Sequence, residues 1–335
     1  MKITIKDIAQ ELNLNFSSVS RALNNKPGVS EETRKLVVDT AKRMGYKPNV
    51  IARGLVSSIT KTIGVIIPDI QNPVFGDLTT AIIETANESE YDVFLCITNW
   101  DHEKEADYIQ TVQQKQVDGI IIKSVQDGHS ELLVDAQVPV VGFESWSGNN
   151  QFSSVSTDNK KGGYIAGLHL IESGYKNTAI VSGPINSTAS INRRQGFMKA
   201  CAENNMNVDT SLIYYGDYNI KGGYQIAKKV LKEHPDVDSF YACNDVMAIG
   251  VLQCLEENGI KPGKEIGVIG FDNIKMAGLP QIRLSTVKQP KNSIGRILTK
   301  VLLDEIHNKQ EDIQNIPQRI LLEPELIIRD TTQKH

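Results

Sequence analysis

The stretch that decides the fold reads Thr4-Ile-Lys-Asp-Ile-Ala-Gln-Glu-Leu-Asn13, then Leu14-Asn15, then Phe16-Ser-Ser-Val-Ser-Arg-Ala-Leu-Asn24. In the first and third segments the apolar residues recur every three or four positions, which is the spacing of one helix face. Because only two residues separate these segments, the two helices are expected to meet through a tight turn. The sequence therefore predicts a helix-turn-helix at the start of the chain.

The turn and the second helix carry residues that suit those positions. Asn13 is among the few non-glycine residues that tolerate left-handed backbone angles, and Asn15 is a good N-cap. The second helix is expected to present a mostly short and polar set of side chains, namely Phe16, Ser17, Ser18, Ser20 and Arg21. Such groups beside one arginine suit base edges and phosphates in a DNA major groove.

A third helix and a linker are expected next. Ser30 is a good cap for the third helix, and Gly45 is expected to end it. Lys47-Pro48-Asn49 then breaks the chain into an extended linker. Residues 50–57 can form one more short helix, but its Gly54 and its length make it unstable alone. We therefore expect this segment to be unfolded without a partner.

The charge of the chain is unevenly distributed. Residues 1–60 contain ten Lys and Arg but only five Asp and Glu, whereas the whole chain has a formal net charge of -4, so the remainder carries -9. A basic head on an acidic body suits the binding of a polyanion at one end. Judged from charge alone, it is equally consistent that these basic residues only solvate the helices.

Targeting and metal signals are not visible in the sequence. No apolar run resembles a signal peptide or reaches membrane-spanning length. The four cysteines are scattered without metal-ligand spacing, at Cys96, Cys201, Cys243 and Cys254. We expect buried or free thiols, no metal, no cofactor and a cytoplasmic location.

From Thr62 onward, short apolar runs alternate with helical patterns. The first series is Ile63–Ile67, Val93–Ile97, Gly119–Ile122 and Val138–Phe143; the second is Thr178–Ser182, Ser239–Cys243 and Ile266–Phe271. Continuous apolar strands alternating with helices indicate parallel sheets that are covered on both faces. Two series predict two α/β lobes.

Polar and aromatic residues follow several of these strands. In open parallel sheets, ligands collect at the carboxyl ends of the strands. The residues just past those ends are Asp69, Asn72, Phe75, Glu144, Ser145, Trp146, Asn244, Asp245 and Asp272. Arg193 opens a helix of the second lobe, and Tyr218 lies in a loop of the same lobe. A binding site is therefore expected where these side chains meet.

The first 55 residues resemble the lactose-repressor (LacI/GalR) family of bacterial transcription regulators. The matching motifs are Thr4–Ala9, Val19–Asn25, Lys26–Arg34, Gly45–Asn49 and Ala52–Leu55. Five ordered motifs are far more specific than a lone helix-turn-helix. The family often has Gly where Asn13 stands and Ser where Asn15 stands, and both replacements keep the turn and cap chemistry.

This resemblance implies two kinds of DNA contact. The expected DNA-binding residues are Thr4, Asn15, Phe16, Ser17, Ser18, Ser20, Arg21, Asn24, Tyr46, Asn49, Ala52 and Leu55. In the family, the short hinge helix folds only on DNA, as a pair, and a leucine at the position of Leu55 enters the minor groove. Double-stranded operator DNA and a homodimer are therefore expected, because paired half-sites mirror a two-fold protein.

The remainder resembles the periplasmic-binding-protein fold that the family uses for effectors. Its motifs are Pro68–Pro73, Thr157–Asn159, His169–Gly174, Arg193–Phe197, Asn244–Gly250 and Gly270–Asn273. The implied domains are 1–46 (DNA-binding, all-α), 47–60 (linker and hinge helix) and 61–335 (effector binding and dimerisation). The chain is expected to cross between lobes near Asp158, near Thr286–Pro290 and near Pro317. Lobe one then spans about 61–158 and 287–316, and lobe two about 159–286 and 317–330.

Carried over by motif, the family's effector contacts are Phe75, Arg193, Tyr218, Asn244 and Asp272. Carboxylate, amide and guanidinium groups bind hydroxyls in pairs, and rings pack on the C–H face of a sugar. Asn244 could instead serve only as a helix cap, and Phe75 and Tyr218 could be core residues. Glu144 and Trp146 are added as candidates, although they depart from the family's commoner pattern.

The predicted function is that of a DNA-binding repressor, cytoplasmic and associated with the nucleoid when bound, whose operator affinity depends on a small effector such as a sugar or sugar derivative. The alternatives are a solute-binding protein, an α/β enzyme on sugars, and a regulator controlled by a partner phosphocarrier protein. An enzyme is not expected, because no P-loop, GxSxG, HExxH or dinucleotide turn occurs. The effector's identity, and whether it releases or promotes DNA binding, stay open.

Overall fold

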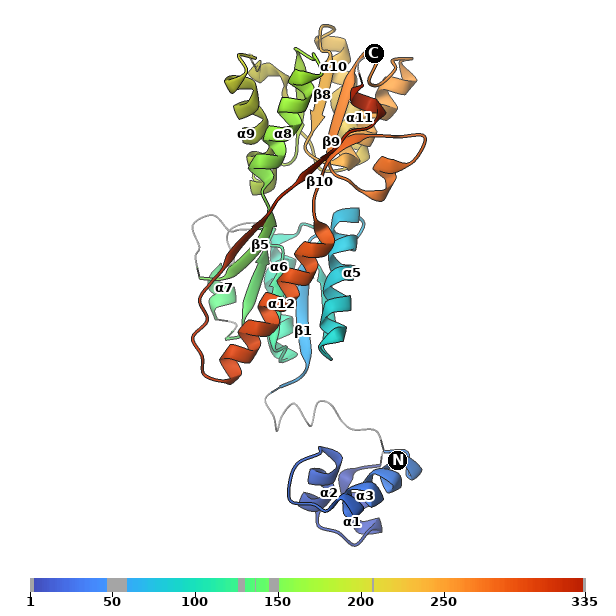
Figure 1. The fold of residues 1–335 in the computed structure, drawn as a ribbon, viewed down its shortest axis with the longest axis vertical. Helices are drawn as coiled ribbons and strands as arrows, with labels where there is room; N and C mark the ends of the chain where they lie inside the picture. Colours follow the sequence, from blue (N-terminus) through green and yellow to red (C-terminus); the bar gives the residue numbers. More distant parts are fainter. Residues whose placement is uncertain are drawn as a thin grey trace. The chain divides into compact units, whose positions relative to one another are not determined.

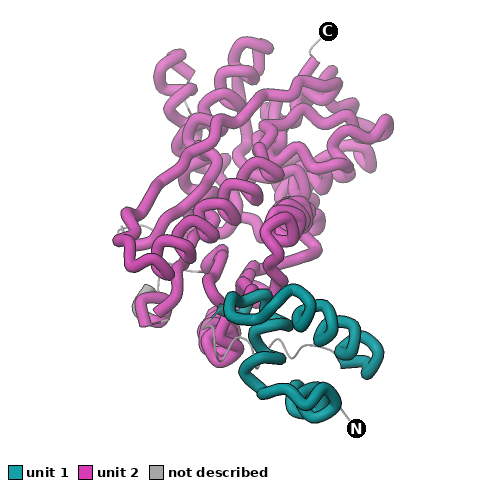
Figure 2. Tube along the Cα trace, turned by 60° about the horizontal axis from the view of Figure 1, so that its bottom comes forward, with its two compact units in different colours: residues 1–60 teal, residues 61–335 magenta. Residues whose placement is uncertain are grey.

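A computed structural model describes residues 3–46, 59–125, 130–135, 137–144, 151–206 and 208–333. The chain divides into two compact units, residues 1–60 and 61–335 (Figure 2). Their elements are traced in Figure 1. The expected hinge segment, residues 50–57, lies outside the described residues.

The N-terminal unit is a three-helix cluster. Its helices are α1 (Ile5–Glu11), α2 (Phe16–Leu23) and α3 (Glu31–Arg43). Ile8, Val19 and Val37, one from each helix, are completely buried in a shared hydrophobic cluster. The helix-turn-helix expected from the spacing of apolar residues is therefore confirmed.

Most of the expected turn and cap residues act as the sequence predicts. Asn13 has a φ of 50°, in the left-handed region, and Gly45 follows α3 with a φ of 71°. The Ser30 hydroxyl accepts a hydrogen bond from the Thr33 N–H, 3.2 Å away. Asn15 stands at the N-cap position of α2 with an extended backbone, but its side chain makes no capping bond.

The second unit contains two six-stranded sheets, each covered by helices on both faces. The first sheet has the order β11-β5-β4-β3-β1-β2, and all its pairings are parallel. Its strands are β1 (Thr62–Ile67), β2 (Asp92–Ile97), β3 (Gly119–Ile122), β4 (Val140–Phe143), β5 (Ser153–Thr157) and β11 (Arg319–Leu322). Helices α5 (Pro73–Glu88) and α12 (Lys291–Gln310) pack together on one face, and α6 (His102–Gln114) and α7 (Ser130–Val134) lie on the other (Figure 1).

The second sheet has the order β12-β10-β9-β8-β6-β7 and is parallel except for the β10–β12 pair. Its strands are β6 (Thr178–Ser182), β7 (Ile213–Tyr215), β8 (Ser239–Ala242), β9 (Gly267–Asp272), β10 (Ser285–Lys288) and β12 (Glu325–Ile327). Its helices are α8 (Asn159–Glu172), α9 (Thr188–Glu203), α10 (Ile220–Glu233) and α11 (Asp245–Glu257). Short 3-10 turns lie at Thr210–Leu212, Lys275–Gly278 and Asp330–Thr332.

The chain crosses between the lobes three times, as Figure 1 lets the eye follow. The first crossing, at Asp158, and the second, at Gln289-Pro290, lie where the sequence placed them, although β10 remains in lobe two through Lys288. The third is later than expected. It follows Leu322 and not Pro317, because β11 pairs with β5 in the first sheet.

The third crossing comes later because the chain after Pro317 is hydrogen-bonded to the edge of the first sheet. The Ser154 N–H donates to the Gln318 carbonyl (2.8 Å), and the Gln318 N–H donates to the Ser153 hydroxyl (2.9 Å). These bonds start β11 at the edge of the first sheet. Residues 317–322 therefore belong to lobe one and not to lobe two.

Within the described ranges, no helix is both long and apolar enough to cross a membrane. In the same ranges, no group of three or more His, Cys, Asp or Glu is arranged to hold a metal ion. The four cysteines are buried and unbridged.

Candidate functional site

The surface of α2 separates cleanly into a buried and an exposed face. Val19 and Ala22 are buried, whereas Phe16, with 53% of its surface exposed, and Ser17 and Arg21 point away from the core. Of the other expected DNA contacts, Thr4, Asn15 and Asn24 are exposed, and Ser18, Ser20 and Tyr46 are half-buried. Asn49, Ala52 and Leu55 lie outside the described residues. The exposed side chains of α2 are thus two polar groups, Ser17 and Arg21, and one ring, Phe16.

The loop after α2 is held by an arginine that sequence reasoning did not single out. Arg34 on α3 donates to the carbonyls of Ala22 (3.4 Å) and Lys26 (3.1 Å). Gly28 has a φ of 94°, and a Cβ there would lie 3.1 Å from Nη1 of Arg21. A side chain at position 28 would therefore crowd the arginine that α2 presents.

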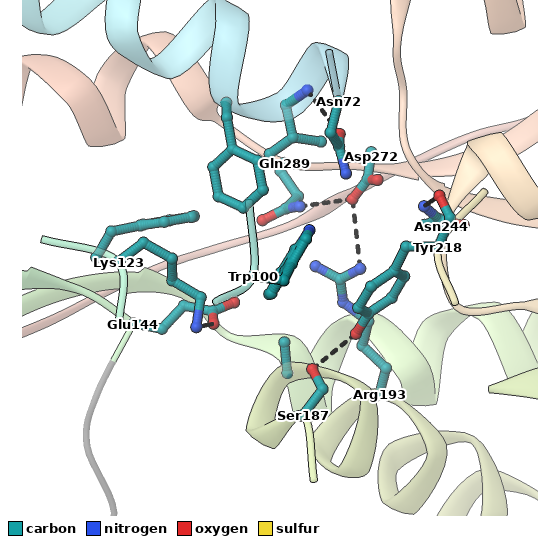
Figure 3. Close-up of a pocket in the computed structure, with 14 residues that line it drawn as sticks. Asn72, Trp100, Lys123, Glu144, Ser187, Arg193, Tyr218, Asn244, Asp272 and Gln289 are labelled. Carbon is teal, nitrogen blue, oxygen red and sulfur yellow. Dashed lines mark hydrogen bonds and ion pairs between the residues drawn. The ribbon is translucent and has the colours of Figure 1, made fainter. Parts of the chain in front are cut away.

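In the second unit, the six described effector candidates converge in the cleft between the two sheets. Figure 3 labels five of them, Glu144, Arg193, Tyr218, Asn244 and Asp272, around the cavity that Phe75 also lines. The cavity has a volume of about 50 Å³ and is lined by Asn72, Val74, Phe75, Trp100, Lys123, Phe143, Glu144, Ser187, Ala189, Arg193, Tyr218, Asn244, Asp272 and Gln289. Trp146, the seventh candidate, lies outside the described residues.

A buried ion pair forms the floor of the cavity. Nη1 of Arg193 lies 3.3 Å from Oδ1 of Asp272, and both side chains are more than nine-tenths buried. Arg193 also donates to Asn159 Oδ1 (2.8 Å) and to the Cys243 carbonyl (2.6 Å), and its guanidinium lies 3.8 Å from the centre of the Phe271 ring. Because these three partners and Asp272 hold the Arg193 guanidinium, its position does not depend on a ligand.

Asp272 is held in an unusual conformation at the end of β9. Its φ of 115° lies in a region that side-chain-bearing residues rarely adopt, which is a form of strain common at functional sites. Gln289 donates to Oδ1 of Asp272 (2.6 Å), and Lys291 donates to its carbonyl oxygen (3.1 Å). Burial raises the pKa of the Asp272 carboxyl, although Arg193 and Lys291 oppose this shift.

Asn244 performs the capping role that sequence reasoning left open, and it also lines the cavity. Its Oδ1 accepts from the Met247 N–H at the start of α11 (2.9 Å), and its Nδ2 donates to the Tyr218 carbonyl (3.2 Å). Tyr218 has a φ of 63°, and its hydroxyl lies 2.7 Å from the Ser187 hydroxyl. Burial raises the pKa of Tyr218, so the phenol stays protonated.

The first lobe contributes a second ion pair and most of the aromatic rings. Nζ of Lys123 lies 3.0 Å from a carboxylate oxygen of Glu144, and both side chains are largely buried. The Phe75 ring meets Phe143 edge-on at 6.3 Å and Trp100 edge-on at 6.1 Å. The cleft therefore combines charged groups at its walls with rings at its centre.

Sequence reasoning missed Trp100, Lys123, Ser187 and Gln289 as lining residues. Trp100 and Lys123 follow β2 and β3, so the rule that ligands gather past strand ends could have found both. Gln289 lies in the second crossing, where both lobes are within reach. Ser187 precedes α9 beside Tyr218 and has no comparable signal in the sequence.

An outer chamber of about 430 Å³ adjoins the cavity. The two share six lining residues, Trp100, Lys123, Phe143, Glu144, Ser187 and Tyr218. The outer chamber is further lined by Ser124, Val125, Pro184, Ile185, Asn186, Thr188 and Asp217. The cleft is thus divided into a small inner part and a larger outer part.

Two family descriptions match the chain. "Bacterial regulatory proteins, lacI family" matches residues 4–49, and "Periplasmic binding proteins and sugar binding domain of LacI family" matches residues 60–322. Among curated proteins, the chain is 35% identical over 328 residues to catabolite control protein A of Priestia megaterium, covering 96% of this chain and 98% of that protein. It is 31% identical over 333 residues to the HTH-type transcriptional repressor PurR of Haemophilus influenzae (strain PittEE), covering 98% of both.

Two solved structures cover nearly the whole chain. The transcriptional regulator CelR–cellobiose complex is 27% identical, with a TM-score of 0.74, and the match covers 98% of this chain and 100% of that one. The lac repressor dimer bound to operator and the anti-inducer ONPF is 24% identical, with a TM-score of 0.89, and the match covers 99% and 100%. The second likeness shows the shared fold.

Proposed function

The chain belongs to the lacI family of bacterial regulatory proteins, and we propose that a sugar or sugar derivative bound between its lobes controls its affinity for operator DNA. The family makes it a transcriptional regulator with a DNA-binding head and an effector domain. The class of effector and the residues that bind it are the proposed part.

The observation that carries the sugar proposal is the Arg193–Asp272 pair beside Asn244 among aromatic rings. Guanidinium and carboxylate groups held 3.3 Å apart offer a donor and an acceptor to neighbouring hydroxyls. Phe75, Trp100 and Phe143 supply apolar faces for C–H groups. The CelR structure, which holds cellobiose, supports the same class.

The DNA contacts are proposed from the exposed face of α2. Phe16, Ser17 and Arg21 are accessible at its surface, Arg34 holds the following loop, and Gly28 leaves room there for the Arg21 side chain. We propose that Phe16 and Ser17 read the bases, because they begin the helix.

We also propose a homodimer on a near-palindromic operator, because paired half-sites mirror a two-fold protein. Analytical ultracentrifugation at micromolar concentration tests it, and a monomer with half-site footprints would contradict it.

The effector site is tested in two steps. A thermal-shift screen over sugars, sugar phosphates and nucleobases identifies what binds the full-length protein. The best ligand is then titrated against labelled operator with the wild type, Asp272→Ala and Arg193→Ala. Lys232→Ala, which removes an exposed charge from α10, serves as the matched control.

Each outcome of the titration has a definite meaning. If the ligand is an inducer, both cleft variants bind operator and ignore it; if it is a corepressor, both bind operator weakly at any ligand concentration. If both variants keep the full response of the wild type, the cleft is not the effector site. A partner protein bound at the surface then becomes the better explanation. A nucleobase as the best ligand would replace the sugar class without moving the site.

A further inference from the structure

Trp100 lies inside the cleft, although 40% of its surface is exposed to solvent. Figure 3 shows its indole between Gln289 on one side and Arg193 and Tyr218 on the other. It lines both the inner cavity and the outer chamber. It therefore stands at the place where the two parts of the cleft would otherwise be continuous.

Rings flank the indole from both lobes. The Phe75 ring of lobe one approaches it at 6.1 Å with an interplanar angle of 67°, and the Tyr218 ring of lobe two lies at 6.3 Å with an angle of 29°. Aromatic pairs make contact at centroid distances of roughly 4.5–7 Å. No further ring fits between Trp100 and either neighbour, so a ligand cannot stack on the indole where it stands.

The volume of the inner cavity leads to the same conclusion. Ligand pockets have volumes of roughly 300–1,000 Å³, whereas the cavity beside Asp272 and Arg193 has about 50 Å³. The polar groups are in place, but a ring-sized molecule has no room beside them. The outer chamber of about 430 Å³ is large enough to receive a displaced side chain.

The backbone holds Trp100 in a strained conformation. Asn99 and Trp100 have consecutive positive φ values of 55° and 61°, and a bulky residue rarely adopts such angles. The segment is fixed on its far side, because the Asp101 N–H donates to the Thr98 carbonyl (3.1 Å) and Asp101 caps α6. Strain of this kind persists only where surrounding contacts maintain it. Here the Thr98–Asp101 hydrogen bond closes a turn around Asn99 and Trp100, and the Phe75 and Tyr218 rings lie beside the indole.

We propose that Trp100 is a displaceable plug of the effector pocket: its indole ring occupies the volume that the effector's ring takes on binding. Binding then requires the indole to move outward and to leave Tyr218, which removes an aromatic contact between the lobes. Trp100 in this way sets both the affinity and the size preference of the pocket. This inference rests on the proposed effector site, but it can be tested without knowing the effector.

The test uses full-length protein and indole as the probe. Trp100→Gly removes the ring and relieves the backbone at that position, because glycine adopts positive φ without strain. Indole is expected to raise the melting temperature of Trp100→Gly and to leave that of the wild type unchanged. Asn99→Gly is the matched control, since it relieves the neighbouring backbone but keeps the ring, and it should not respond to indole.

A second arm uses D-ribose, D-glucose and cellobiose as sugar probes. A plug lowers apparent affinity by the fraction of molecules in which the pocket is open, so its removal should tighten binding, on the order of tenfold. Indole should compete with the sugar for Trp100→Gly. Trp100→Phe keeps a ring and should stay close to the wild type.

Opposite results would overturn the proposal. If Trp100→Gly binds sugar more weakly than the wild type, the indole is a surface for the ligand and not a plug. If indole stabilises both proteins equally, or neither, the ring has no cavity of its own. If none of the sugars binds any variant while indole still stabilises only Trp100→Gly, the plug stands and the sugar class of the effector is wrong.

Discussion

At the scale of single residues, the second lobe buries two carboxylates close to the same strand ends. Asp245 accepts hydrogen bonds from the Thr286 hydroxyl (2.5 Å) and the Ile274 N–H (2.9 Å) and is completely buried. Asp272 belongs to the cavity floor. Burial, and to a lesser extent the Asp272 charge, raise the pKa of Asp245 to about 8. The carboxyl of Asp245 is thus neutral at pH values below about 8.

This shift predicts a pH dependence that Asp245→Asn should remove. The pKa of Asp245 in the folded protein, about 8, is above the usual aspartate value of 3.8, so the neutral carboxyl stabilises the folded state. This stabilisation is fully present below pH 3.8 and is lost as the pH rises through about 8. The wild type's melting temperature should fall over this window relative to that of Asp245→Asn. Parallel curves for the two proteins would contradict the shift.

The exposed face of α2 predicts how single substitutions change DNA binding. Arg21→Ala should weaken operator binding by about 1–3 kcal/mol, because it removes one contact to a base or phosphate. Exchanging Phe16 and Ser17 together should instead change the preferred half-site, since they begin the helix. Selection from a randomised half-site library measures the change. A uniform loss over all sequences would show that these two residues do not read bases.

At the scale of elements, the helices of the N-terminal unit begin in different ways. The Thr4 N–H and hydroxyl both donate to the Asp7 carboxylate (2.7 and 2.8 Å) at the start of α1, and Ser30 caps α3 with its hydroxyl. The side chain of Asn15 makes no capping bond at α2. The start of α2 is therefore determined by its packing and by the turn at Asn13 more than by a cap.

This difference can be measured with two alanine variants. Ser30→Ala should lower the free energy of unfolding of the N-terminal unit by about 1 kcal/mol, the usual value of a lost cap. Asn15→Ala is the comparison and should have a smaller effect on stability. Urea unfolding followed by circular dichroism resolves the two. Equal losses would mean that Asn15 makes a cap bond in solution.

The hinge segment is the element whose prediction depends most on DNA. Leu55→Ala should reduce binding to operator far more than binding to non-specific DNA, because an inserted apolar side chain gains only where the central base step can be unstacked. Hydrogen exchange of residues 50–57 should slow when operator is added. Protection of this segment in the free protein would refute folding that is coupled to DNA.

At the scale of the whole effector unit, the cavity floor is connected to the crossings between lobes. Gln289, at the second crossing, donates to Asp272 and accepts from the Thr157 hydroxyl (2.8 Å), which precedes the first crossing. Lys291 donates to the Asp272 carbonyl and pairs with Asp77 on α5 (3.2 Å). A ligand that contacts Asp272 therefore contacts a residue that Gln289 and Lys291 connect to the first lobe.

Coupling of this kind must be reciprocal. If an effector changes operator affinity by some factor, operator must change effector affinity by the same factor. The corresponding coupling free energy is typically about 1–3 kcal/mol. Isothermal titration of the effector into the free protein and into the operator complex measures both sides of the cycle. Gln289→Ala should reduce this coupling more than it reduces effector binding itself. An unchanged coupling in that variant would show that the crossing does not transmit it.

The helix-turn-helix and the two α/β lobes could be predicted from the sequence because their signals are local. Asn13, Ser30 and Gly45 act through neighbours a few residues away, and the apolar runs of β1 and β9 are readable as buried strands. β5 could not be found in this way. Its sequence, Ser153-Ser-Val-Ser-Thr157, contains one apolar residue, yet the whole strand is buried between β4 and β11.

The sequence by itself determined the family, the helix-turn-helix, the alternation of buried strands and helices in two lobes, and most of the charged residues of the cleft. Only the tertiary structure decided that Trp100 lines the inner cavity, that Gln289 joins both lobes to Asp272, and that β11 belongs to the first lobe. The reason is the separation of the partners along the chain. Gln289 and Thr157 are 132 residues apart, and no periodicity or cap relates residues at that distance; only the paired sheets bring them together.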